Sequence, residues 1–316
     1  MQASAYPAGD YLYPALYSFC MRPELEQAIE LLQHHDSSDD ERALGLLQAT
    51  VFNFSMKVCG HREDAEDTMQ EVLLKSLRYL PKFDSPKALA VWLYKVARNN
   101  CLMKRRRSKF APKEHLSLEE LMPNVAEMKA LASEPRNTPE AQTLRVEEAS
   151  ILRKAVLRVP PQYRLVLVLH DMEGLDAADV ARVLAIREGT VRVRLHRARL
   201  FVRKELAKRA KSRHRRLPTS TLSRPRRCKD MFAALSDYMD GVLDDSMCDE
   251  LEKHLNGCVP CENFLDSLER TIAQCRSLDS GCRSKTAGKM RKKLLAEYRR
   301  AVETLGEGSH PGAKLS

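Results

Sequence analysis

The chain has 316 residues and a formal net charge of +10, and only 12 of its residues are glycine. This length is enough for two or three domains, and the positive charge favours a polyanionic partner such as nucleic acid. Apolar residues recur at helical spacing almost throughout, so the sequence predicts an all-α protein. No apolar run approaches the roughly 20 residues that cross a bilayer, and we expect no membrane partner.

The cysteines argue against a secreted, disulfide-bonded protein. There are nine of them, an odd number, and most are scattered along the chain. Residues 1–20 lack the basic start and apolar core of a secretory signal. We therefore expect a cytoplasmic protein whose cysteines are thiols or metal ligands.

A first helical domain is predicted over residues 23–108, after a flexible tail at 1–22. Its helices are expected at 24–33, 39–59, 62–80 and 88–107. The third helix carries acidic and amide side chains on the face opposite its apolar stripe, namely Asp64, Asp67, Gln70 and Glu71. Acidic residues in a first turn also suit the helix dipole, which is the plainer explanation for them.

The fourth predicted helix combines an aromatic residue with cations. Trp92 precedes Arg98 and Asn99, and the helix ends in Lys104, Arg105, Arg106 and Arg107. Aromatic rings can stack on unpaired bases while cations hold the backbone. Four consecutive cations exceed what a helix dipole needs. This pattern indicates a surface for single-stranded DNA, although a Trp92 that is simply packed in the core is equally consistent.

Four prolines interrupt residues 109–143, which are interpreted as a linker with one helical turn near Leu118. A second domain is predicted over residues 144–208. Its helices are expected at 147–159, 162–172, 176–184 and from 188 onwards. Only three residues separate the last two helices, which is the helix-turn-helix arrangement.

The last helix of this domain has an apolar stripe through Val191, Leu195 and Val202. Five arginines are predicted on its remaining surface: Arg192, Arg194, Arg197, Arg199 and Arg203. Arginine in the major groove reaches guanine edges and phosphates, so the helix and the preceding Arg187 are predicted to bind duplex DNA. The alternative, a solvated basic helix, does not explain the preceding helix and tight turn.

Residues 25–207 resemble the extracytoplasmic-function group of bacterial sigma factors. Asp64 to Val72 resembles the region 2 helix that clamps the β′ coiled coil of RNA polymerase, and Trp92 to Asn99 resembles the helix that meets the melted minus-10 element. Phe83 lies in the loop where that family captures a flipped base. Val159 to Arg164 and Glu188 to Arg199 resemble region 4. The resemblance implies that Glu188 and Thr190 also face DNA, and that the partners are promoter DNA and core polymerase, through its β′ coiled coil and β flap.

A basic linker at 209–227 leads to a segment of opposite charge. Residues 228–266 hold ten acidic residues against two lysines. Within a domain predicted at 228–280, Cys228 is followed by His254, Cys258 and Cys261. A His and a Cys four apart at a helix end share a face, and a Cys-x2-Cys turn presents two thiolates to one point. This set predicts a closed, structural zinc site, with Cys248 as a rival ligand on another helix face.

This segment resembles the zinc-binding domain of anti-sigma factors, with the four predicted ligands at the family's ligand positions. Residues 188–216 hold twelve basic and two acidic residues. The opposed charges suggest that residues 228–305 contact the sigma-like domains within the same chain and tune or mask them. Two alternatives stay open: the zinc domain only keeps the tail folded and soluble, or Cys258 and Cys261 form a redox switch. A last helix is expected at 285–305, within a C-terminal segment at 281–316.

The sequence is consistent with three classes of protein. The favoured one is a promoter-specificity subunit of RNA polymerase without chemistry of its own. The second is a helix-turn-helix repressor or activator that acts without being a polymerase subunit. A metal-dependent nucleic-acid enzyme ranks last, because it needs an open metal site and the sequence offers a closed one.

Overall fold

The computed structural model describes residues 23–33, 37–76, 79–80, 83, 85–106, 115–123, 127, 145–212 and 226–278, together with the isolated positions 292, 295–296 and 300. Every element in these ranges is a helix, which confirms the all-α prediction. None of these helices is long and apolar enough to cross a bilayer. The tail at 1–22, most of the linker at 109–143 and most of the helix predicted at 285–305 lie outside the described residues.

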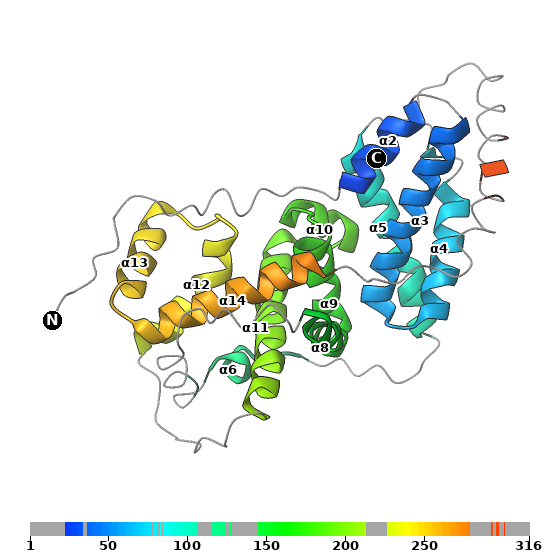
Figure 1. Cartoon of the computed structure of the whole chain (residues 1–316). Coiled ribbons are helices and arrows are strands. Elements are labelled where there is room, and N and C mark those ends of the chain that lie inside the picture. Colours follow the sequence, from blue (N-terminus) through cyan, green and yellow to red (C-terminus); the bar gives the residue numbers. More distant parts are fainter. Residues whose placement is uncertain are drawn as a thin grey trace.

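Four helices form an N-terminal unit (Figure 1). They are α2 (Pro23–Gln33), α3 (Ser37–Cys59), α4 (Arg62–Ser76) and α5 (Pro86–Arg106). The central α3 packs against the other three, with Leu44, Leu47 and Phe54 fully buried. Gly60 ends α3 with a positive φ of 78°, a conformation that favours glycine, and its N–H donates to the Met56 carbonyl. The helix predicted to run to residue 80 ends at Ser76.

A middle unit contains α8 (Arg145–Arg158), α9 (Pro161–Leu167), the π-helical turn η3 (Val168–Met172), α10 (Ala177–Leu184) and α11 (Glu188–Ser212). Helices α10 and α11 are the predicted helix-turn-helix pair. Asp176 caps α10 by accepting the Asp179 N–H at 2.7 Å, and Ala185 ends it with a left-handed φ of 53°. The helix predicted at 162–172 widens in its last turn, where the Glu173 N–H donates to the carbonyl of Val168.

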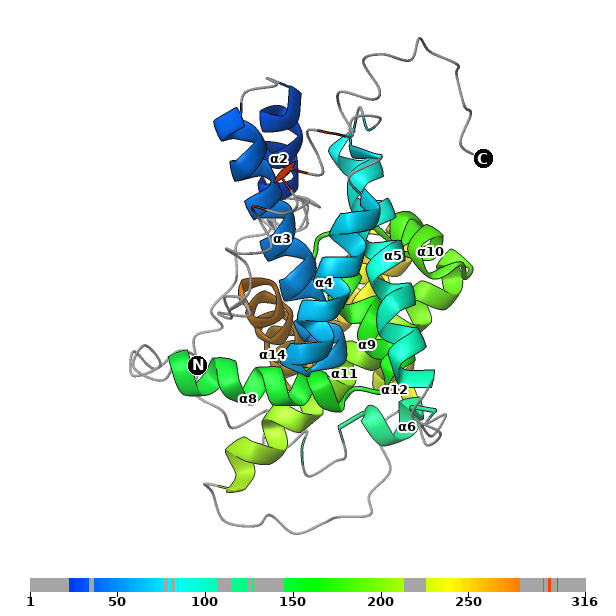
Figure 2. The ribbon, with the colours of Figure 1, turned by 90° about the vertical axis from the view of Figure 1, so that its right-hand side faces the viewer.

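The N-terminal and middle units pack against each other and share one continuous apolar core (Figure 2). Buried polar contacts reinforce the junction between them. Lys57 of α3 pairs with Glu173 at 2.8 Å, and these side chains are 4% and 1% exposed. The Tyr94 hydroxyl of α5 donates to the other oxygen of Glu173 at 2.8 Å. Arg164 of α9 donates to the Val58 carbonyl at 2.7 Å.

A C-terminal unit contains α12 (Arg226–Met239), α13 (Asp245–Leu255) and α14 (Val259–Ser277). It has its own apolar core, in which the rings of Phe232 and Phe264 meet edge to face, with centroids 4.6 Å apart. Helix α14 crosses α11 and η3, and α12 also packs against α11 (Figure 1). The helical turn predicted near Leu118 is α6 (Leu118–Leu121), which contacts α11 as well.

Two arginines of α11 are buried by this packing. Arg199 is 0% exposed and Arg203 is 8% exposed, so the prediction that both lie on the open surface of the helix was wrong. Helix α12 and the residue after it, Asp240, cover the first, and α14 covers the second. The Arg203 guanidinium lies 3.9 Å from the centroid of the Phe264 ring, and its Nε donates to Ser267 Oγ at 2.6 Å.

Arg199 is held between two carboxylates from different units. Its Nε and Nη2 donate to Asp171 of η3 at 2.9 and 2.7 Å, and its Nη1 and Nη2 donate to Asp240 at 2.9 and 2.8 Å. Burial would raise the pKa of Asp171, but the charge and hydrogen bonds of Arg199 outweigh it and hold that pKa below its usual range. Arg199 therefore joins the C-terminal unit to the middle unit through a fully buried, paired charge.

Replacing Arg199 by methionine should lower the free energy of unfolding by about 3–5 kcal/mol, because it leaves the buried carboxylate of Asp171 without its cation. Urea denaturation of the full chain followed by circular dichroism measures the loss. The half-buried Arg194 of the same helix provides the matched control, since Arg194→Met removes the same charge and should cost less than about 1 kcal/mol.

The pH dependence of this difference identifies its cause. The ion pair stabilises the fold above the ordinary carboxyl pKa of about 4, and its contribution is lost as the pH falls through the lower pKa of folded Asp171. In Arg199→Met, burial acts on Asp171 without this compensation and holds its pKa above the ordinary value of about 4. The difference in unfolding free energy between wild type and Arg199→Met should therefore be largest near neutral pH, begin to narrow above about pH 4, and narrow further as the pH falls toward the lower pKa of wild-type Asp171. A difference in unfolding free energy that stayed constant from neutral to acidic pH would show that Arg199→Met destabilises the fold through lost packing instead.

Candidate functional site

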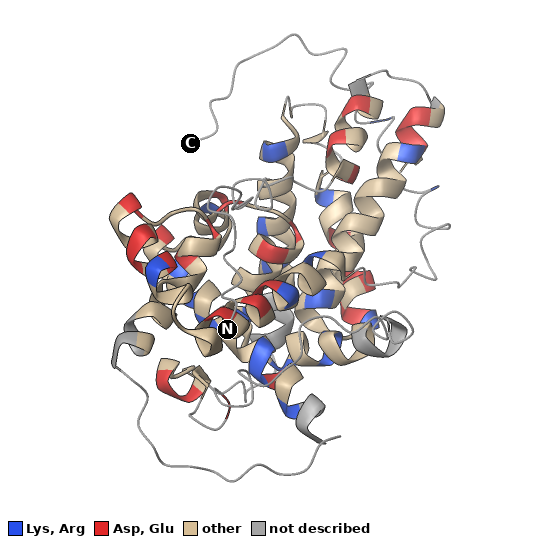
Figure 3. Cartoon of the chain, turned by 60° about the vertical axis from the view of Figure 1, so that its left-hand side comes forward, with Lys and Arg blue, Asp and Glu red and all other residues tan. Residues whose placement is uncertain are grey.

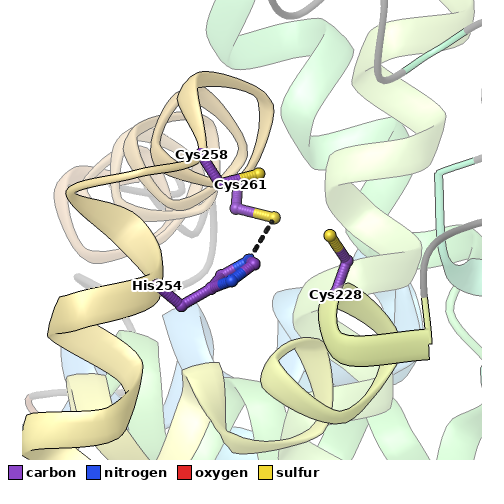
Figure 4. A group of neighbouring side chains, drawn as sticks. All are labelled: Cys228, His254, Cys258 and Cys261. Carbon is purple, nitrogen blue, oxygen red and sulfur yellow. Dashed lines mark hydrogen bonds between the residues drawn. The ribbon is translucent and has the colours of Figure 1, made fainter.

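The four predicted metal ligands meet at one point in the C-terminal unit (Figure 4). Cys228 lies in the first turn of α12, His254 near the end of α13, and Cys258 and Cys261 at the start of α14. The ligand atoms of the four residues all lie within 4.8 Å of one another. The imidazole Nε2 of His254 is 3.2 Å from the sulfur of Cys261.

Local backbone structure explains why the last three ligands converge. Helix α13 ends in a tight turn, in which Gly257 and Cys258 donate to the carbonyls of His254 and Leu255. Cys258 is the residue before α14. Pro260 occupies the first turn of that helix, where a backbone N–H would have no partner within the helix, so a proline loses no hydrogen bond there. The Cys261 N–H then donates to the Cys258 carbonyl at 2.9 Å. The two thiols are thereby held one helical turn apart.

The donor set fits a four-coordinate metal ion. Burial, together with neighbouring Cys258 and Cys228, raises the pKa of the Cys261 thiol. Burial likewise raises the pKa of Cys228, so these two thiols resist ionisation unless a cation binds the thiolates. Cys248, the rival ligand, does not belong to this group, and its sulfur points instead toward the Leu243 carbonyl, 4.0 Å away. Three sulfurs and one imidazole fill a tetrahedron and leave no open position for catalysis.

The residues predicted to bind duplex DNA lie at the start of α11 and in the turn before it. Arg187 is exposed. The others, namely Glu188, Thr190, Arg192, Arg194 and Arg197, are half-buried. Arg192 forms an ion pair with Glu188 one turn earlier. The apolar stripe of the helix is buried as predicted, with Val191, Leu195 and Val202 at most 1% exposed.

Helix α12 lies along one flank of this basic helix. The hydroxyl of Ser236 is 2.8 Å from Nδ1 of His196, a residue of α11. Burial, followed by the charges of Arg199 and Arg197, lowers the pKa of His196 to about 4, so its ring is neutral at physiological pH. Burial raises the pKa of Asp237 of α12, against the opposing effect of the nearby charges of Arg192 and Arg199. The C-terminal unit thus places carboxylates beside the arginines of α11.

An aromatic cluster occupies the surface that was predicted to bind single-stranded DNA. The ring centroid of Trp92 is 5.9 Å from that of Phe83 and 5.5 Å from that of Tyr79. Trp92 is half-buried, so it is both packed and accessible, and Tyr79 is 44% exposed. Sequence reasoning missed Tyr79 because it lay within a predicted helix. The backbone of Lys104, Arg105 and Arg106 belongs to α5, and their side chains lie outside the described residues.

The same helix α5 packs against α10 of the helix-turn-helix pair. Arg98 donates to the carbonyl of Val183 at 3.3 Å. Lys87 pairs with Asp176 and Asp179 at 2.8 Å each. Asn99 remains exposed. The helix predicted to bind single-stranded DNA is therefore in contact with the first helix of the helix-turn-helix pair.

The predicted polymerase-binding residues lie along the outer side of α4. Asp67 and Glu71 are exposed, and Asp64 and Gln70 are half-buried. The buried side of the helix is formed by Ala65, Met69, Val72 and Leu73. This placement leaves a polar strip on the N-terminal unit.

Three family models match the chain in the order of its units. A model described as sigma-70 region 2 matches residues 45–110, and one described as sigma-70 region 4 matches residues 149–202. A zinc-finger model matches residues 228–261, a range that begins and ends at two of the four metal ligands.

Curated relatives give the same assignment. The ECF RNA polymerase sigma factor SigM of Mycobacterium tuberculosis is 35% identical over 137 residues, which cover 43% of this chain and 61% of SigM. The RNA polymerase sigma-H factor of Pseudomonas aeruginosa is 30% identical over 194 residues, 57% of this chain and 93% of that protein. SigW of Bacillus subtilis is 24% identical over 186 residues, 59% of this chain and 98% of SigW. The chain thus belongs to the extracytoplasmic-function sigma factors of the sigma-70 family and carries an added C-terminal zinc-finger domain.

Proposed function

We propose that this protein is a promoter-specificity subunit of RNA polymerase and has no catalytic activity of its own. The observation that carries the proposal is the presence on one chain of a region 2 helix with an aromatic cluster and a region 4 helix-turn-helix with an arginine-rich second helix. The first suits unpaired bases, and the second suits the major groove. The polar strip of α4, with Asp64, Asp67, Gln70 and Glu71, would bind the β′ coiled coil of core polymerase in the cytoplasm, and the middle unit would bind the β flap.

The closed arrangement of the units is proposed to be a masked state. Two contacts support this proposal. Arg98 of α5 donates to Val183 of α10, and Lys87 of α5 pairs with Asp176, so the middle unit occupies part of the helix predicted to bind single-stranded DNA. Helix α12 and Asp240 occupy the flank of α11 that contains His196 and Arg199. Binding to separated promoter elements then requires the units to move apart.

A specific ion pair, and not the bulk acidic charge of the C-terminal unit, supports its docking on the middle unit. Exposed acidic residues gather on α13 and the turn before it, namely Asp244, Asp245, Asp249 and Glu250 (Figure 3). The docking contacts themselves use a smaller set of groups, since Asp240 is the carboxylate that reaches α11. A zinc domain that only kept the chain soluble would not need this buried ion pair across units. The specific pair therefore favours tuning of the sigma domains over a solubilising role.

Neutralising Arg194 and Arg197 together should reduce run-off transcription by core polymerase at least about tenfold, because each contact to DNA contributes about 1–3 kcal/mol. Binding to core polymerase, measured by co-purification, should be unchanged. The exposed Arg182 of α10 supplies the control variant Arg182→Ala. Undiminished initiation by the Arg194→Ala, Arg197→Ala double variant would refute the proposed role of α11 in DNA binding. If the wild-type chain did not bind core polymerase, it would instead be a repressor or activator that acts without being a polymerase subunit.

Weakening the docked interface should raise transcription. Asp240→Asn removes one of the two charges that hold Arg199, and a loss of about 1.4 kcal/mol shifts a docking equilibrium about tenfold. We expect higher run-off yield and faster proteolysis of the segment between α11 and α12. Asp249→Asn makes the same chemical change on the exposed surface of α13 and should leave both readouts at the wild-type level. An unchanged yield from Asp240→Asn, despite faster proteolysis, would rule out masking.

The metal is proposed to be a structural zinc ion held by Cys228, His254, Cys258 and Cys261. The purified full chain should contain about one zinc per molecule, as a three-cysteine, one-histidine site requires. Cys258→Ser combined with Cys261→Ser should abolish the zinc content and lower the thermal stability of the C-terminal unit. Cys248→Ser is the matched control, and it should retain the metal. Atomic emission on the three proteins measures the outcome, and zinc retained by the double variant would assign the metal elsewhere.

A further inference from the structure

A pair of cysteines in the N-terminal unit lies outside the zinc site and outside both DNA-binding surfaces. Cys59 is the last residue of α3, and Cys101 lies near the end of α5. Their sulfur atoms are 2.7 Å apart, although the residues are separated by 42 positions in the sequence. We propose that Cys59 and Cys101 are a redox-active pair that forms a reversible disulfide. This inference does not depend on the proposed function.

The distance between the sulfurs supports bond formation without rearrangement of the helices. Non-bonded heavy atoms in a packed interior rest at about 3.5–4.0 Å, whereas a disulfide bond is about 2.05 Å long. A separation of 2.7 Å lies closer to the bonded value. Helices α3 and α5 also pack against each other.

The two thiols differ in their access to solvent, which gives each a separate role. Cys59 is half-buried and can be reached by a small reagent. Cys101 is 1% exposed, with the Thr68 hydroxyl 3.9 Å from its sulfur. In a redox pair the accessible thiolate attacks the oxidant, and the protected partner then resolves the intermediate. Cys59 is therefore the attacking residue and Cys101 the resolving one.

The oxidant that drives formation of the Cys59–Cys101 disulfide is a low-molecular-weight disulfide. The Cys59 thiolate attacks one of its sulfurs, which forms a mixed disulfide and releases one small thiolate. Cys101 loses its proton and attacks the Cys59 sulfur, so the Cys59–Cys101 bond forms and a second small thiolate leaves. Two protein thiols are oxidised, one small disulfide is reduced to two thiols, and an excess of small thiol reverses the reaction.

The pair lies beside the junction of the N-terminal and middle units. The residue before Cys59, Val58, accepts a hydrogen bond from Arg164, and Lys57 pairs with Glu173. The residue after it, Gly60, faces Leu157 of α8 so closely that an added Cβ would lie 2.9 Å from that side chain. A bond at Cys59 therefore fixes the turn on which the middle unit packs.

Peptide mapping of the full, zinc-loaded chain tests the proposal. The protein is equilibrated with oxidised glutathione, the remaining thiols are alkylated under denaturing conditions, and trypsin is added without reductant. Cleavage after Lys57, Arg62, Arg98 and Lys104 gives the peptides 58–62 and 99–104. We expect them as one disulfide-linked species, about tenfold more abundant than any other cysteine pair because the sulfurs are already in contact. Reduced glutathione should separate them.

Two single substitutions distinguish this pair from general thiol oxidation. Cys101→Ala should leave Cys59 as a mixed disulfide with glutathione, since the resolving thiol is gone. Cys248→Ala removes a half-buried thiol of α13 and should leave the 58–62 to 99–104 linkage intact. The proposal would be overturned if Cys59 and Cys101 of the wild-type protein were recovered as alkylated thiols or linked to other cysteines. This measurement uses the wild-type protein alone and does not require any variant to fold.

Discussion

The buried guanidinium of Arg199 is the interaction on which the arrangement of the chain depends. An arginine with no exposed surface is stable only where its charge and its donors are matched, and here Asp171 and Asp240 supply both requirements. One carboxylate comes from the middle unit and the other from the segment after α12. The C-terminal unit is therefore attached to the sigma-like part of the molecule by a specific contact and not by apolar burial alone.

Much of this structure could be predicted from local patterns. Helical spacing located the helices of the N-terminal and middle units to within a few residues, and the His-x3-Cys-x2-Cys spacing identified ligands that converge in the folded chain. The burial of Arg199 could have been suspected, because it lies four residues after Leu195 and three before Val202 on the edge of the apolar stripe. Its partners could not, since they lie 28 and 41 residues away and no local pattern relates them.

The junction between the N-terminal and middle units shows a second limit of local patterns. Lys57 lies on a helix where a lysine would ordinarily reach solvent, yet it is buried against Glu173 and Tyr94. Such buried pairs fix one geometry more than they add net stability. The aromatic cluster and the basic helix could each be assigned to DNA binding from sequence, but the packing of the N-terminal unit on the middle unit depends on this distant pair.

The π-helical turn η3 has a consequence for how the two junctions relate. Asp171 contacts Arg199 on the side of the C-terminal unit, and Glu173, two residues later, contacts Lys57 on the side of the N-terminal unit. A single short turn thus serves as a common pivot, and a displacement that breaks one contact shifts the other. Any coupling that this turn transmits is reciprocal by thermodynamic necessity: if release of the zinc-finger domain weakens the contact with region 2, then opening of region 2 loosens the zinc-finger domain by the same factor.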